Sequence, residues 1–126
     1  MAHVAIYLKG WRDQTLFTDA VNDDDHPLHA EAYADWLQGW KPYAPGQTVY
    51  LAFKYHEADA DPRVILNAAF ERFNVGTDDI ARRYREGGNR SLSVGDLVVI
   101  DGEAWACASA GWDQVPAPAP APPVSV

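Results

Sequence analysis

The chain has 126 residues, 48% of them hydrophobic, and a net charge of −8, which suits one globular domain and argues against binding to bulk nucleic acid. No apolar run approaches the ~20 residues needed to cross a bilayer, and the N-terminus lacks the basic and apolar regions of a signal peptide. The single Cys107 has no partner for an internal disulfide, so we expect a cytoplasmic protein with no membrane contact.

In the first half of the chain, alternation of apolar and polar residues predicts strands, and three- to four-residue spacing predicts a helix. His3–Lys9 alternates as an opening strand, and Thr15–Val21 is predicted as its partner, joined to it by a turn over residues 10–14. A helix with a broad aromatic stripe is predicted over Leu28–Trp40. Gln47–Glu57 then alternates as a second long strand.

Two further helices are predicted from their end signals. Asp61 followed by Pro62 is typical of a helix start, and the helix continues over Arg63–Phe73. Thr77 and the two aspartates after it begin a shorter helix, which ends at Glu86 before a pair of glycines.

A β-hairpin is predicted between Ser91 and Trp112. Asp101-Gly102 is a strong two-residue turn signal between the apolar strand Leu97–Ile100 and the returning strand Glu103–Ser109. Three alanines of the returning strand share one face, against which we expect a helix to pack.

These elements predict an α+β domain over residues 1–115, with a small mixed or antiparallel sheet, two to three helices and the C-terminal hairpin. Residues 116–126 alternate proline and alanine, a composition that cannot pack a core and predicts an extended tail.

The segment before the hairpin combines guanidinium groups, an aromatic ring, glycines and hydroxyl groups, which is a pattern suited to phosphate or a nucleotide. The alternative is an exposed basic helix end that complements the helix dipole and pairs with acidic residues. The candidate ligand-binding residues are Arg82, Arg83, Tyr84, Arg85, Arg90, Ser91 and Ser93.

Residues 13–40 contain seven acidic residues and no Lys or Arg. Together with the aromatic stripe, this segment predicts a contact surface for a basic protein, the alternative being a charge run that only aids solubility. The candidate protein-contact residues are Asp23, Asp24, Asp25, Glu31, Asp35, Trp36 and Trp40.

No set of residues predicts catalysis. His26 and His29 lie beside three aspartates, but a proline separates them, so a metal-dependent hydrolase is the weakest of the hypotheses considered. Cys107 lies among alanines, where a thiol is usually a small apolar side chain. No P-loop or dinucleotide motif is present. The sequence therefore favours a non-enzymatic protein, with no catalytic residues, metal ligands or cofactor assigned.

Three segments carry a family resemblance: Leu66–Asn74, the Ser-Leu-Ser-Val-Gly-Asp run that begins at Ser91, and Ala104–Trp112. Together they resemble the YodL-like domain, over about residues 63–115. The resemblance implies a protein of a plasmid, conjugative element or phage, without established catalytic residues. It suggests a binding protein that blocks a host defence or regulatory factor in the bacterial cytoplasm, with a host protein as partner. The alternative is a binder of a nucleotide or small phosphorylated molecule.

Overall fold

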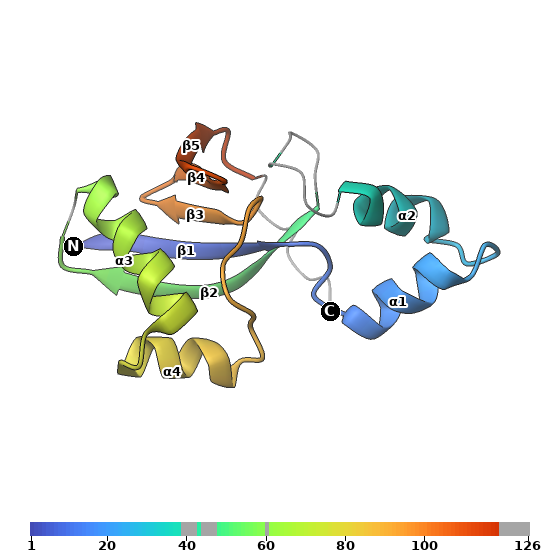
Figure 1. The fold of residues 1–126 in the computed structure, drawn as a ribbon, viewed down its shortest axis with the longest axis horizontal. Helices are drawn as coiled ribbons and strands as arrows, with labels where there is room; N and C mark the ends of the chain where they lie inside the picture. Colours follow the sequence, from blue (N-terminus) through green and yellow to red (C-terminus); the bar gives the residue numbers. More distant parts are fainter. Residues whose placement is uncertain (39–42, 44–47, 60, 119–126) are drawn as a thin grey trace.

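Strand β1 (Ala2–Lys9) is an interior strand of a five-stranded sheet. It pairs with β2 (Val49–Glu57) on one side and with β3 (Leu97–Ile100) on the other. The sheet continues through β4 (Glu103–Ala108) to β5 (Gly111–Val115), in the order β2-β1-β3-β4-β5 (Figure 1). Every neighbouring pair is antiparallel, which confirms the α+β class and the C-terminal hairpin.

This computed structural model describes residues 1–38, 43, 48–59 and 61–118. The predicted end of the aromatic helix at Trp40 and most of the proline- and alanine-rich tail lie outside those ranges. Within them the chain forms four helices, and none of these is long and apolar enough to span a membrane.

The helices α3 (Pro62–Val75) and α4 (Asp79–Glu86) cover one face of the sheet (Figure 1). Alternate residues of β1 point to this face and are at most 2% exposed, as expected for a half-covered strand. Phe73 of α3 and Tyr84 of α4 pack against each other there, with ring centroids 4.3 Å apart. Asp61 caps α3 as predicted, and α4 is capped by Asp78, one residue after the predicted Thr77; each aspartate accepts a hydrogen bond from the first helical turn.

The predicted strand Thr15–Val21 is wrong: these residues lie in helix α1 (Gln14–Asn22). Asp13 is the N-cap, and its side chain accepts the backbone N–H of Leu16 at 2.9 Å. The predicted turn over residues 10–14 therefore contains a helix start, and the apolar residues after it follow helical rather than strand spacing. Helix α1 packs against α2 (His29–Gln38), and the pair extends beyond the sheet (Figure 1).

The hairpin turn has the predicted geometry, with positive φ values of 48° at Asp101 and 87° at Gly102. Its first strand, β3, spans the predicted Leu97–Ile100, and a third strand, β5, follows after a further turn that ends at Gly111. Because Trp105 lies opposite Val98 in the ladder, the tryptophan side of β4 joins the helix-covered core. Helices α3 and α4 thus lie on the tryptophan side of β4 and not on the alanine side, where a helix was expected.

Candidate functional site

Arg90 lies in the connection between α4 and β3 and is held by Asp96, which is 1% exposed. Nη1 of Arg90 donates to Oδ2 of Asp96 at 2.6 Å, and Nη2 donates to Oδ1 at 2.8 Å. The carboxylate also accepts the backbone N–H groups of Lys9 at 2.8 Å and Ser93 at 2.7 Å. These bonds compensate the buried charge, and the hydrogen bond to Asp96 raises the pKa of Arg90.

Tyr84 belongs to the core rather than to the surface. It is fully buried, and its hydroxyl donates to the carbonyl oxygen of Arg90 at 2.7 Å. Its ring also meets Phe53 edge to face, with centroids 5.7 Å apart. Burial raises the pKa of Tyr84. The ring is therefore not available to stack on a base.

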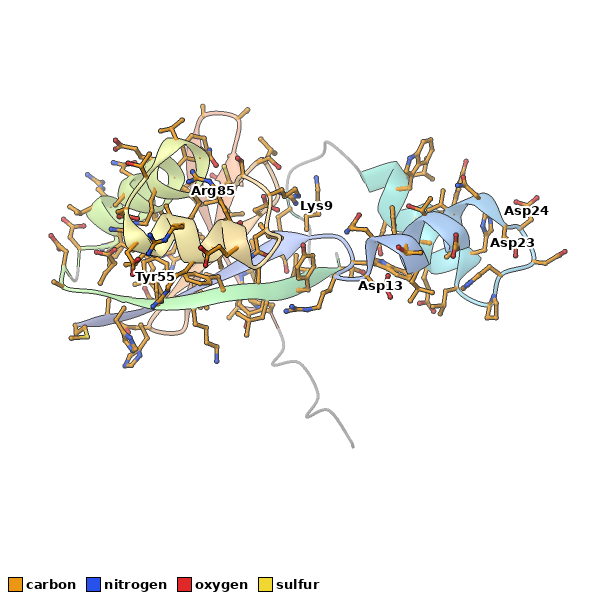
Figure 2. The ribbon with its side chains drawn as sticks, turned by 90° about the horizontal axis from the view of Figure 1, so that it is seen from below. Lys9, Asp13, Asp23, Asp24, Tyr55 and Arg85 are labelled. Carbon is orange, nitrogen blue, oxygen red and sulfur yellow. The ribbon has the colours of Figure 1, made fainter. Side chains whose placement is uncertain are left out.

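The remaining arginines of the predicted ligand site point to separate places. Arg82 is exposed and pairs with Asp79 and, at 3.8 Å, with Glu86 on its own helix. Arg83 lies over the ring of Phe53, 5.8 Å from its centroid. Arg85, labelled in Figure 2, donates to the carbonyl oxygen of Gly76 at 2.6 Å. These three side chains do not converge with Arg90 on one point.

The two predicted serines differ in their roles. Ser93 donates its backbone N–H to Asp96 and lines a pocket that Arg90 also lines. Ser91 is exposed, and its carbonyl oxygen accepts Nη1 of Arg90 at 3.0 Å. Of the predicted ligand-binding residues, only Arg90 and Ser93 come together at a cavity.

Helices α1 and α2 form an acidic hairpin that projects from the sheet (Figure 2). Ala20 and Ala32, one from each helix, are fully buried, so the two helices can approach closely. Helix α2 carries three large exposed side chains, Tyr33, Trp36 and Leu37, which are 45%, 55% and 53% exposed. We call these three residues the α2 stripe. Tyr33 lies between His29 and Trp36, with ring centroids 5.7 and 5.8 Å away.

The acidic residues are distributed along the hairpin. Asp23 and Asp24 lie at the end of the hairpin far from the sheet, whereas Asp13 lies at the near end (Figure 2). Asp25 and Glu31 are also exposed, and Asp35 is half-buried. Oδ2 of Asp35 accepts the indole N–H of Trp11 at 2.6 Å. Trp40, the last predicted contact residue, lies outside the described residues.

The two histidines of the hairpin stabilise its turn by separate contacts. Nδ1 of His26 accepts the backbone N–H of Leu28 at 3.0 Å. Nδ1 of His29 lies 2.8 Å from the carbonyl oxygen of Ala20, and Nε2 lies 3.6 Å from Asp24. Among the described residues, no three His, Cys, Asp or Glu side chains are grouped so that they could hold a metal ion.

A pocket of about 500 Å³ lies where the acidic hairpin joins the sheet. Its walls come from four parts of the chain: the end of β1 with the start of α1, the helix α2, the start of β2, and the α4–β3 connection. Sequence reasoning missed most of it, because no local pattern indicates that these segments meet. The lining residues it did not single out are Lys9, Gly10, Trp11, Gln14, Phe17, Thr48, Tyr50 and Gly88.

Comparison with protein-family models, curated proteins and solved structures found no match to this chain. The resemblance of residues 63–115 to the YodL-like domain therefore stays a prediction. Function has to be argued from the site, because a fold class alone does not determine it.

Proposed function

We propose that this protein acts by binding, without catalysis, and that the acidic hairpin is its contact surface for a basic protein. The observation that carries the proposal is the α2 stripe, in which three large side chains are about half exposed on an acidic hairpin. Exposed apolar groups rimmed by polar residues are typical of interaction sites. Aromatic side chains are also enriched at the centres of protein interfaces.

The charge of the hairpin supports a partner of opposite sign. Residues 13–40 carry seven carboxylates and no Lys or Arg, so their field attracts a basic surface. Asp25 and Glu31 are exposed at the surface of the hairpin. Charges at the rim of such a contact speed association and orient the partner.

The shape of the stripe favours a helix as the partner's contact element. Tyr33, Trp36 and Leu37 follow three- and four-residue spacing and form a short apolar ridge. A helix presents apolar residues with the same spacing, so the two ridges can interdigitate. The proposed partner is therefore a basic amphipathic helix on another protein. We further propose that the partner protein is a defence or regulatory factor of a bacterial host. The YodL-like resemblance supports this choice of partner.

The proposal is tested with a designed peptide of lysines and leucines, whose leucines repeat at helical spacing, titrated into the full chain by NMR. A peptide of the same composition in scrambled order is the first control. We expect saturable binding of the helical peptide alone, with shifts at the indole N–H of Trp36. Binding should weaken as the salt concentration rises toward about 0.15 M, because salt screens exposed charges.

A matched pair of variants distinguishes binding at the α2 stripe from non-specific binding to exposed apolar groups. The double substitution Tyr33→Ser and Leu37→Ser removes two exposed apolar groups of α2 and should weaken binding by at least about tenfold. The control, Val64→Ser with Val75→Ser, removes two exposed apolar groups of α3, which are 48% and 72% exposed. Equal binding of the scrambled peptide, or unchanged binding by the stripe variant, would contradict the proposal.

A further inference from the structure

We propose that the pocket at the base of the acidic hairpin binds a flat, uncharged heteroaromatic molecule of about the size of a nucleoside. The proposal does not depend on the proposed function, because it concerns a cavity and a different class of ligand; Trp36 is the one residue that the pocket shares with the α2 stripe. The volume of the pocket, about 500 Å³, falls within the range of roughly 300–1,000 Å³ that is usual for small-molecule sites.

Aromatic side chains from three elements line the pocket. Phe17 comes from α1, Trp36 from α2 and Tyr50 from β2, and Trp11 lies in the connection between β1 and α1. Trp11 and Phe17 meet edge to face, with centroids 5.5 Å apart and an interplanar angle of 62°. Rings at such different orientations offer a flat ligand both stacking and edge contacts. This favours a planar ring over an aliphatic chain.

Polar groups at the same walls provide specificity for a ring that has donors and acceptors at its edge. Oδ2 of Asp35 accepts the indole N–H of Trp11, which fixes both side chains at the wall. A carboxylate can accept about four hydrogen bonds, so Asp35 can also accept a hydrogen bond from an amino group of a ligand. The side chains of Gln14 and Thr48, which also line the pocket, can each donate and accept.

The charges at the pocket disfavour a phosphate group. Nη1 of Arg90 donates to Asp96 and to the carbonyl oxygen of Ser91, while Nη2 donates to Asp96 and to the carbonyl oxygen of Lys9. Both terminal nitrogens of Arg90 therefore already donate hydrogen bonds within the protein, and the Asp96 carboxylate balances the guanidinium charge. Lys9 and Asp35 add one positive and one negative charge at the wall, so the lining offers a phosphate no net positive charge. The Arg90 side chain is 44% exposed, which leaves part of its planar group open for stacking on a ligand ring.

The test uses adenosine, guanosine, cytidine and uridine as probes, each alongside its 5′-monophosphate, titrated into the full chain. The indole N–H signal of Trp11 reports on the pocket in NMR spectra, and that of Trp36 reports on both the pocket and the α2 stripe. We expect at least one nucleoside to saturate with a Kd at or below about 1 mM. Its monophosphate should bind no more tightly than the nucleoside.

Variants on one helix supply the matched control. Phe17→Ala removes a wall of the pocket and should weaken nucleoside binding by at least about tenfold, which corresponds to the loss of one stacking contact. Leu16→Ala changes a 36%-exposed neighbour that does not line the pocket and should bind as the wild type does. Trp36→Ala is a second pocket variant, and because Trp36 is 55% exposed, its loss should leave the fold intact.

Three results would overturn the proposal: no saturable binding by any nucleoside, equal losses in Phe17→Ala and Leu16→Ala, or a monophosphate that binds more than tenfold tighter than its nucleoside. The Tyr33→Ser and Leu37→Ser variant separates this pocket from the protein-contact surface. This variant should bind the helical peptide weakly and should still bind the nucleoside as the wild type does, because neither residue lines the pocket.

Discussion

Arg90 and Asp96 form a bidentate ion pair that connects the α4–β3 segment to the end of β1. Two guanidinium nitrogens of Arg90 donate to the two oxygens of Asp96 at 2.6 and 2.8 Å. The backbone N–H of Lys9 donates to the same carboxylate at 2.8 Å. A buried carboxylate therefore organises one side of the pocket while it holds the segment that leads into β3.

Removing Arg90 should destabilise the fold, because it leaves Asp96 charged and 1% exposed with fewer donors. Breaking a fully buried pair costs about 3–5 kcal/mol. Since Arg90 is 44% exposed, we expect Arg90→Ala to lower the free energy of unfolding by about 2 kcal/mol. Urea denaturation measures the difference. The control is Arg82→Ala, an exposed arginine on α4 that should change the free energy by less than about 0.5 kcal/mol. Equal effects of the two variants would contradict the structural role of Arg90.

Two buried tyrosines should respond differently to loss of the hydroxyl group. The hydroxyl of Tyr84 donates to the carbonyl oxygen of Arg90 at 2.7 Å, whereas that of Tyr55 has no hydrogen-bond partner among the described residues. Tyr84→Phe should therefore lower the free energy of unfolding by about 1 kcal/mol, and Tyr55→Phe should leave it nearly unchanged or raise it. Thermal or urea unfolding of the two variants checks the order, and the reverse order would refute it.

Stability should decline at alkaline pH because of Tyr55. Burial raises the pKa of Tyr55 from 10.0 to about 12. The folded state thus favours the neutral phenol, and this contribution is complete below pH 10 and is lost as the pH rises through about 12. Tyr55→Phe should make the decline between these values shallower. Urea unfolding at several alkaline pH values measures it, with Tyr33→Phe as the exposed control. A decline of the same steepness in Tyr55→Phe would count against the assignment.

Asp78 should stabilise α4 in a pH-dependent way. Its side chain accepts the backbone N–H of Ala81 at 2.8 Å, and this hydrogen bond lowers the pKa of Asp78 below 3.8. A carboxyl with a lowered pKa stabilises the fold above its ordinary pKa, and the effect is lost as the pH falls through the lowered value.

We therefore expect Asp78→Ala to lower the free energy of unfolding by about 1 kcal/mol near neutral pH. The difference from the wild type should shrink at acidic pH, as the pH falls through the lowered pKa of Asp78 and the wild-type carboxyl is protonated. Circular dichroism during urea unfolding at both pH values measures it. Asp79→Ala, at the neighbouring exposed position, is the control and should have a smaller effect, since Asp79 does not cap the helix.

The elements that sequence reasoning placed well are those specified by contacts within a few residues. The capping aspartates Asp61 and Asp78 identify the starts of α3 and α4, and Asp101-Gly102 identifies the hairpin turn. The same kind of signal was present at Asp13 and was missed, because the residues after it were interpreted as a strand partner for β1. That error is local, and the capping pattern could have corrected it.

The candidate sites depended on the tertiary structure. A sequence shows that four arginines lie close together between residues 82 and 90, but the direction of each side chain depends on how α4 packs against the sheet. Only this packing buries Tyr84 and pairs Arg90 with Asp96. The pocket likewise unites Lys9, Asp35 and Arg90, which are far apart in the chain. Sequence by itself determined the local elements and the acidic charge of residues 13–40, whereas contacts between distant segments arise only when the elements pack, and those contacts decided the sites.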